Sequence, residues 1–141
     1  MKKIILTIGV SCMLACTTSC TIETSGNGDL DGNWQLMQMD SVGNGKTTDM
    51  KEKQIFYAVQ FKLLNIHDYN YGGSNYFFHF EHKGDSLILN ATPGDAGKGY
   101  KTDDLRKYGI NSLNERFGIK LLNKNDMIIE SSLLKLKFRK F

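Results

Sequence analysis

The sequence predicts a mainly-β protein in which antiparallel strands follow one another as a meander and close into a small barrel. We expect seven to eight strands with one or two short helices. Three observations support this: apolar and polar residues alternate along residues 55–64, a glycine turn joins two alternating stretches in residues 76–91, and residues 119–138 alternate again. Closure would remove the exposed strand edges of such a sheet.

The first predicted strand, residues 30–39, carries the only tryptophan, Trp34, two residues after Gly32. Residues 41–53 are polar and contain glycine, which indicates a loop with one helical turn. Residues 55–64 are predicted to form one long, half-buried strand because β-branched, aromatic and aliphatic side chains recur at every second position. That face holds Ile55, Tyr57, Val59, Phe61 and Leu63.

The next two strands fit one hairpin. Gly84 and Asp85 form a two-residue turn with glycine first, as a type II′ turn requires. This turn pairs Phe80 with Leu89 and Phe78 with Ala91 on one face. On the opposite face it pairs His79 with Asn90. The register is well specified, because a slip of one residue would turn every apolar side chain outward.

The last three strands are predicted to form a meander with one apolar face. A loop at residues 124–126 would pair Leu121 with Ile129, and a turn at residues 132–133 would pair Ile129 with Leu136. Glu130 and Lys135 then oppose each other on the polar face. The apolar face of this meander holds Ile119, Leu121, Met127, Ile129, Leu134, Leu136 and Phe138.

Upstream of the meander, residues 103–116 indicate short helical turns interrupted at a glycine.

The amino terminus has the features of an export signal. Two lysines precede an apolar run over residues 4–15, which is shorter than the roughly 20 residues that span a bilayer. The three cysteines all lie at or before Cys20, so no disulfide framework is expected. Thr18 and Ser19 before Cys20 resemble the end of a bacterial lipoprotein signal, in which the cysteine becomes the lipid-modified first residue. Cys16 is the rival site, and an ordinary secretory signal is the remaining alternative.

These features predict a signal peptide at 1–19, a flexible tether at 20–29 and a domain at 30–141. Removing residues 1–19 takes away two lysines and no acid, so the formal charge falls from 18 − 15 = +3 to 16 − 15 = +1. A nearly neutral chain is not expected to bind nucleic acid. A lipid at Cys20 would hold it at a membrane surface. We expect the cell envelope, at the outer membrane, on its periplasmic face or the cell surface.

Five segments together resemble the small lipocalin-like lipoproteins of Gram-negative bacteria: LDGNWQLM, KQIFYAVQFKLL, YFFHFEHKGDSLIL, KYGINSLNERF and LKLKFRKF. The resemblance covers nearly all of residues 30–141 and implies a lipocalin-like (calycin) barrel. It also implies that Gly32 and Trp34 seal the closed end while Arg139 lies across the indole as a cation–π partner. The alternative is that Trp34 is an ordinary core residue and Arg139 a solvated one.

The sequence indicates no catalytic, cofactor or metal site. His79 and His82 point to opposite faces of a strand, and His79 with Glu81 supplies only two ligands, which is too few for zinc. The leading hypothesis is therefore binding of a small, largely apolar ligand in the barrel, lined by Tyr57, Val59, Phe61, Tyr76, Phe78 and Leu89.

An aromatic cluster around the glycine turn at residues 72–73 indicates either a ligand or partner surface at the barrel mouth, or packing of the core and turn. Its members are Tyr69, Tyr71, Tyr76, Phe77 and Phe78. The alternative function is a structural or interaction lipoprotein whose barrel is filled by its own side chains. The sequence does not identify a protein partner for it.

Overall fold

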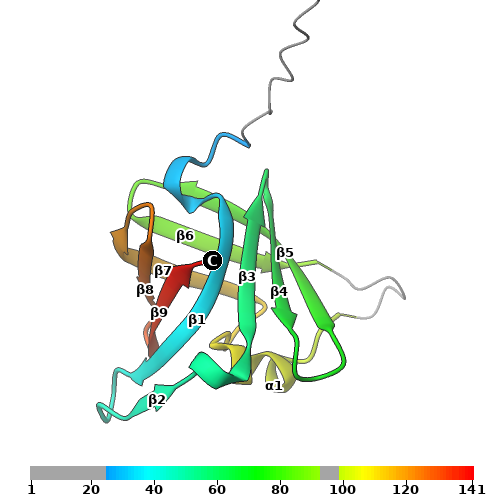
Figure 1. Cartoon of the computed structure of the whole chain (residues 1–141), viewed down its shortest axis with the longest axis vertical. Helices are drawn as coiled ribbons and strands as arrows, with labels where there is room; N and C mark the ends of the chain where they lie inside the picture. Colours follow the sequence, from blue (N-terminus) through cyan, green and yellow to red (C-terminus); the bar gives the residue numbers. More distant parts are fainter. Residues whose placement is uncertain (1–24, 93–98) are drawn as a thin grey trace, which may run out of the picture.

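A computed structural model describes residues 25–92 and 99–141. Within these residues nine antiparallel strands form one sheet, and eight of them close into a barrel (Figure 1). The predicted barrel is confirmed. The strand that lies outside it is β2, which pairs only with the far end of β1. The strands are β1 (Gly32–Ser41), β2 (Thr47–Asp49), β3 (Ile55–Gln60), β4 (Leu63–Asp68), β5 (Ser74–Lys83), β6 (Ser86–Ala91), β7 (Asn114–Leu122), β8 (Asp126–Glu130) and β9 (Leu134–Lys140).

The barrel closes between its first and last strands. β1 runs antiparallel to β9, with Trp34 opposite Lys140 and Leu36 opposite Phe138. The register shifts just after Leu36, where β1 carries a bulge. The predicted meeting of the last strand with the first is therefore confirmed.

Two predicted hairpins are confirmed in register. In the β5–β6 hairpin Phe80 pairs with Leu89, and Gly84 takes the positive φ of 55° that a turn with glycine first requires. In the β8–β9 hairpin Ile129 pairs with Leu136. Both registers place alternate apolar side chains inside the barrel.

The predicted β7–β8 register is wrong. Leu121 pairs with Ile128 and not with Ile129, because a bulge between Ile119 and Leu121 adds one residue to β7. The bulge reverses the alternation beyond it, so Leu121 is exposed although it was assigned to the apolar face. The charge pairing in the next hairpin holds, with Lys135 Nζ 3.6 Å from a Glu130 carboxylate oxygen.

The predicted long strand over residues 55–64 is also wrong. The chain turns at Phe61 and Lys62, so β3 and β4 form a tight hairpin. Phe61 takes a left-handed φ of 55°, and its side chain is 49% exposed. Leu63 is exposed as well. The alternation misleads here because apolar residues continue through a turn that the barrel does not bury.

Short segments cover the two ends of the barrel (Figure 1). The amino-terminal segment, with the 3-10 turn η1 (Gly28–Leu30), lies over one end, and η2 (Lys51–Lys53), α1 (Thr102–Leu105) and η3 (Arg106–Tyr108) lie at the other. The predicted helical turns begin as expected, but residues 114–116 belong to β7. Leu30 at one end and Leu105 and Tyr108 at the other are fully buried.

The predicted signal peptide, Cys20 and the first half of the tether lie outside the described residues. The second half of the tether, residues 25–29, is held against the barrel. The Asn27 side-chain amide donates to the Phe61 carbonyl at 2.6 Å, and the backbone N–H of Asn27 donates to Asp31 at 3.1 Å. This part of the chain is therefore the edge of the domain.

Candidate functional site

The closed end of the barrel is built around Trp34. Its indole is fully buried, and its ring N–H donates to the Leu30 carbonyl at 2.9 Å. The 3-10 turn that carries Leu30 thus satisfies the one polar group of the indole, which would otherwise be costly to bury. The Leu30 side chain, itself fully buried, packs into the same end of the core.

The cation over Trp34 is Lys140, and the expectation for Arg139 is corrected by one residue. Lys140 Nζ lies 4.6 Å from the indole ring centroid and donates to the Asp29 carbonyl at 2.9 Å. Arg139 is exposed and donates to the Gln35 side chain at 3.2 Å. The parity of β9 explains this, because Lys140 pairs with Trp34 whereas Arg139 pairs with Gln35.

Gly32 lies at this end, and its conformation brings the Lys140 side chain close. Its φ of 127° lies where side chains are rarely tolerated, and a Cβ there would lie 3.2 Å from Lys140 Cε. The glycine therefore lets the lysine stem pass directly over the start of β1.

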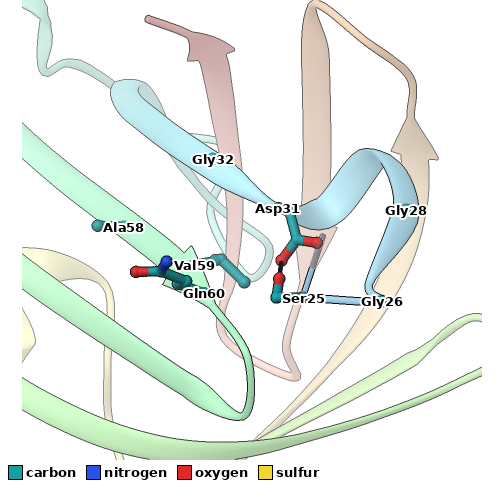
Figure 2. Close-up of a pocket in the computed structure, with 8 residues that line it drawn as sticks. All are labelled: Ser25, Gly26, Gly28, Asp31, Gly32, Ala58, Val59 and Gln60. Carbon is teal, nitrogen blue, oxygen red and sulfur yellow. Dashed lines mark hydrogen bonds between the residues drawn. The ribbon is translucent and has the colours of Figure 1, made fainter. Parts of the chain in front are cut away.

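A hollow of about 670 Å³ lies beside this end, between the amino-terminal segment and the last residues of β3. Figure 2 shows Ser25 and Asp31 turned toward each other, with Val59 and Gln60 on the neighbouring strand. Much of the wall is backbone or small residues, namely Gly26, Gly28, Gly32 and Ala58. The hollow is therefore walled mainly by backbone and short side chains and not by large apolar ones.

The one carboxylate in this hollow, Asp31, is already occupied. It accepts hydrogen bonds from the Ser25 hydroxyl and, at 2.7 Å, from the Asn27 side chain. Burial acts to raise the pKa of Asp31, but these hydrogen bonds and the charge of Lys140 outweigh it, so the pKa lies below its ordinary value. Asp31 serves to fix the amino-terminal segment.

The opposite end, the mouth, is closed by Tyr108. Its side chain is fully buried, and its hydroxyl donates to Asp68 at 2.9 Å, while the Tyr57 hydroxyl donates to its backbone carbonyl. Burial and the neighbouring Asp68 carboxylate raise the pKa of the Tyr108 hydroxyl, and burial likewise raises that of Tyr57. Both phenols therefore stay protonated as hydrogen-bond donors.

Asp68 organises the turn around the mouth. It is 3% exposed and ends β4, and its other carboxylate oxygen accepts the backbone N–H groups of Asn70 and Tyr71 at 3.0 and 3.2 Å. Lys107 Nζ lies 3.9 Å from Asp68 and 4.1 Å from the centroid of the Tyr71 ring. One carboxylate thereby joins the β4–β5 turn to the segment that carries Tyr108.

A second cavity, of about 210 Å³, opens between these groups at the mouth. We call it the mouth cavity. Its apolar wall consists of Met50, Ile55 and the ring of Tyr71, and its polar groups are Lys53, Asp68, Asn70 and Lys107. Because Asp68 already accepts three hydrogen bonds, the two lysine amines are the charged groups that can meet an acceptor or anionic group of a ligand. The cavity is smaller than the roughly 300–1,000 Å³ of most ligand sites.

The six residues predicted to line a ligand site do not share one cavity. Tyr57, Val59, Phe78 and Leu89 point inside the barrel, where they are buried in the core. Tyr76 is half-buried and packs on the rings of Tyr100 and Tyr108. Phe61 does not line the interior, because it occupies the exposed β3–β4 turn.

The interior between the two ends is occupied by large side chains. Counting the two end residues Trp34 and Tyr108, five aromatic side chains are less than 2% exposed: Trp34, Tyr57, Phe78, Tyr108 and Phe117. Of the residues around the mouth cavity, the sequence indicated only Tyr71, through the aromatic cluster. Asp68, Met50 and Lys107 come from separate segments, and no spacing in the sequence links them.

The described residues offer little for metal or acid–base chemistry. Within residues 25–92 and 99–141, no three His, Cys, Asp or Glu side chains form a group that could hold a metal ion. His79 and Glu81 are exposed on the outer face of β5. Along the same residues, none of the helices is both long and apolar enough to span a bilayer.

Comparison with known proteins agrees with the fold. A lipocalin-like protein from Bacteroides uniformis ATCC 8492 superposes with a TM-score of 0.67 at 24% identity, covering 81% of this chain and 100% of its own. An uncharacterized protein from Bacteroides eggerthii DSM 20697 gives 0.61 at 21% identity, covering 79% and 98%. No curated protein matches. The family model of the lipocalin-like domain matches residues 13–141, so the chain belongs to the lipocalin-like domain family.

Proposed function

We propose that this is a lipid-anchored protein of the cell envelope that binds a small, largely apolar ligand at the barrel mouth without catalysis. The observation that carries the proposal is the mouth cavity, where Met50, Ile55 and Tyr71 form an apolar wall beside two lysines. Such a wall with a few polar groups is typical of small-molecule sites. A ligand with an apolar body and one acceptor or anionic group matches it.

The mouth is a better location than the interior. The inward residues Tyr57, Phe78 and Leu89 already contact other core side chains, and interiors of this kind are close-packed. A ligand could reach them only if Tyr108 and its segment moved away. The mouth cavity needs no such movement, and its size favours a short chain over a drug-sized molecule.

Octanoate and octanol test this proposal on the full mature protein. Calorimetric titration should give tighter binding for octanoate, because its carboxylate meets Lys107 and Lys53. Y71A should weaken octanoate binding about tenfold, which corresponds to ~1.4 kcal/mol. Y69A is the matched control, because Tyr69 is a neighbouring exposed tyrosine that packs on Phe56 outside the cavity. Equal effects of Y71A and Y69A would argue against the mouth cavity.

A filled barrel without ligand is the second candidate, and the five buried aromatic side chains favour it. Native mass spectrometry separates the two, using protein extracted gently from its own host. A retained small-molecule mass that disappears in Y71A supports ligand binding. Unliganded protein, together with no binding of octanoate or octanol, supports an interaction role for the exposed surface.

The anchor is proposed at Cys20, which follows Thr18 and Ser19. C20A should release the protein from membranes into the soluble fraction, and C16A is the matched control that should leave it membrane-bound. The reverse result would move the anchor to Cys16. Thr21 follows the proposed anchor, so the aspartate that retains lipoproteins at the inner membrane is absent, which favours the outer membrane.

A further inference from the structure

The β3–β4 turn exposes an aromatic ring in an unfavourable backbone conformation. Phe61 takes a φ of 55° with a 49% exposed side chain. A left-handed conformation costs a residue with a Cβ about 1–2 kcal/mol, and glycine or asparagine would avoid most of that cost. Because the exposed ring adds little to the core, its presence points to a role outside the barrel.

This turn is tied to the point where the amino-terminal segment joins the barrel. The Asn27 side chain donates to the Phe61 carbonyl at 2.6 Å and to Asp31 at 2.7 Å. Ser25, the first described residue, also donates to Asp31. Phe61 therefore lies at the same end of the barrel as the entry of the chain, opposite α1 (Figure 1).

The chain before Ser25 sets the greatest distance between the barrel and a lipid at Cys20. Five residues span at most about 18 Å in any conformation, at ~3.6 Å each. β1 alone has 10 residues, or about 33 Å at ~3.3 Å each. The entry end can therefore reach the lipid surface, and the barrel is longer than the connection that holds it there.

We propose that the closed end of the barrel faces the membrane, that the Phe61 side chain enters its headgroup region, and that the mouth points away from the lipid. This rests on the proposed lipid anchor at Cys20. An apolar ring next to a lysine, here Lys62, suits the boundary between acyl chains and headgroups. The mouth cavity then stays open to the aqueous side, where a soluble ligand can enter.

The contact is expected to be apolar and not electrostatic. The strand ends, turns and entry segment at this end carry both signs of charge: Asp29, Asp31, Lys62, Lys83, Asp85, Lys124, Asp126, Arg139 and Lys140. These charges largely cancel, so vesicles of phosphatidylcholine alone are the appropriate surface. Residues at the mouth end, such as Leu133, whose carbonyl accepts from the Val42 N–H, should stay in water.

Depth-dependent quenching on the lipid-modified full chain tests this orientation. The sequence has no cysteine after Cys20, so F61C introduces a single thiol for an environment-sensitive fluorophore once Cys20 is lipid-modified. L133C is the matched control, since Leu133 is an apolar turn residue of similar exposure, 55% against 49%. F77C, on the side wall at 45% exposure, reports a barrel lying flat. K62C labels the same turn while keeping Phe61.

After reconstitution with nitroxide-labelled phosphatidylcholine, probes at 61 and 62 should lose most of their emission and shift to the blue, while the probe at 133 stays unquenched. Equal quenching at 61 and 133, or stronger quenching at 77 or 133, would overturn the orientation alone. A wild-type protein that takes up the thiol label and does not sediment with vesicles would overturn the anchor and the orientation together.

Discussion

At the closed end of the barrel, the seal is the chain that leads into β1, whereas at the mouth it is a segment inserted between β6 and β7. Trp34 finds its hydrogen-bond partner four residues away, at Leu30. Tyr108 is held by Asp68 and Tyr57, which lie 40 and 51 residues away. A local seal forms with the strand it covers, but a remote seal must close a long loop. The mouth is therefore the end expected to open more readily.

The largest expected effect compares the two seals directly. W34A and Y108A should each lower the free energy of unfolding by about 3–5 kcal/mol, because each removes a fully buried ring. Urea denaturation measures both. Octanoate titration separates them, since only Y108A enlarges the cavity at the mouth. An equal increase in octanoate affinity in W34A and Y108A would show that the two ends open equally well to the ligand.

The second-largest difference is expected between Gly109 at the mouth and Gly32 at the closed end, in the stability that each loses when replaced by alanine. A Cβ at Gly109 would lie 2.7 Å from Leu136 Cδ2, at a φ of 90°, so G109A should cost about 2–4 kcal/mol from strain and overpacking. At Gly32 the near atom belongs to the flexible end of Lys140, and G32A should cost only ~1–2 kcal/mol. Thermal unfolding of the two variants gives the comparison, and a larger loss for G32A would contradict it.

The third comparison is between the carboxylates of Asp68 at the mouth and Asp31 at the closed end. D68N should lower the free energy of unfolding by about 1–3 kcal/mol, since Asp68 is buried and accepts three hydrogen bonds. D31N should cost ~1 kcal/mol because Asp31 is partly exposed.

Asp31 also predicts that the stability contributed at the closed end depends on pH. Burial opposes ionisation of Asp31, but its hydrogen bonds and Lys140 prevail and lower its folded-state pKa. Its stabilisation is therefore present above the unfolded pKa, about 3.9, and is lost as pH falls through the lower folded pKa. The difference between wild type and D31N in urea denaturation should shrink from pH 6 to pH 2.5. A difference that stays constant with pH would show that ionisation of Asp31 does not cause it.

The smallest effect lies within the closed end. K140M removes the cation over Trp34 and should cost about 0.5–1 kcal/mol. R139M removes one exposed hydrogen bond to Gln35 and should cost less than ~0.5 kcal/mol. Tryptophan fluorescence should shift in K140M and not in R139M, and the opposite pattern would return the cation role to Arg139.

The sequence was sufficient where turn chemistry and alternation agree. Gly84 sets the β5–β6 register, and the partner of each apolar residue follows from it. It was insufficient where one residue changes parity without leaving a pattern. The bulge before Leu121 is such a case, and so is the turn at Phe61, where apolar residues continue through a reversal.

The mouth cavity was beyond sequence reasoning for a different reason. Asp68, Tyr108 and Lys107 meet because the chain between β6 and β7 folds back over the barrel, a long-range contact that no local spacing encodes. Part of the closed end could be anticipated from the resemblance to the lipocalin-like lipoproteins, which implies that Gly32 and Trp34 lie there. Even there the cation was misassigned by one position, since β9 pairs Lys140 with Trp34.

The seam between β1 and β9 also determines when folding can finish. β1 emerges from the ribosome well before β9, its partner along this edge, has been made. Until residues 134–140 arrive, the edge of β1 has no native neighbour on that side, and a nascent ribbon of this kind can pair with another chain. Loss of residues 134–140 would therefore leave an aggregation-prone open sheet.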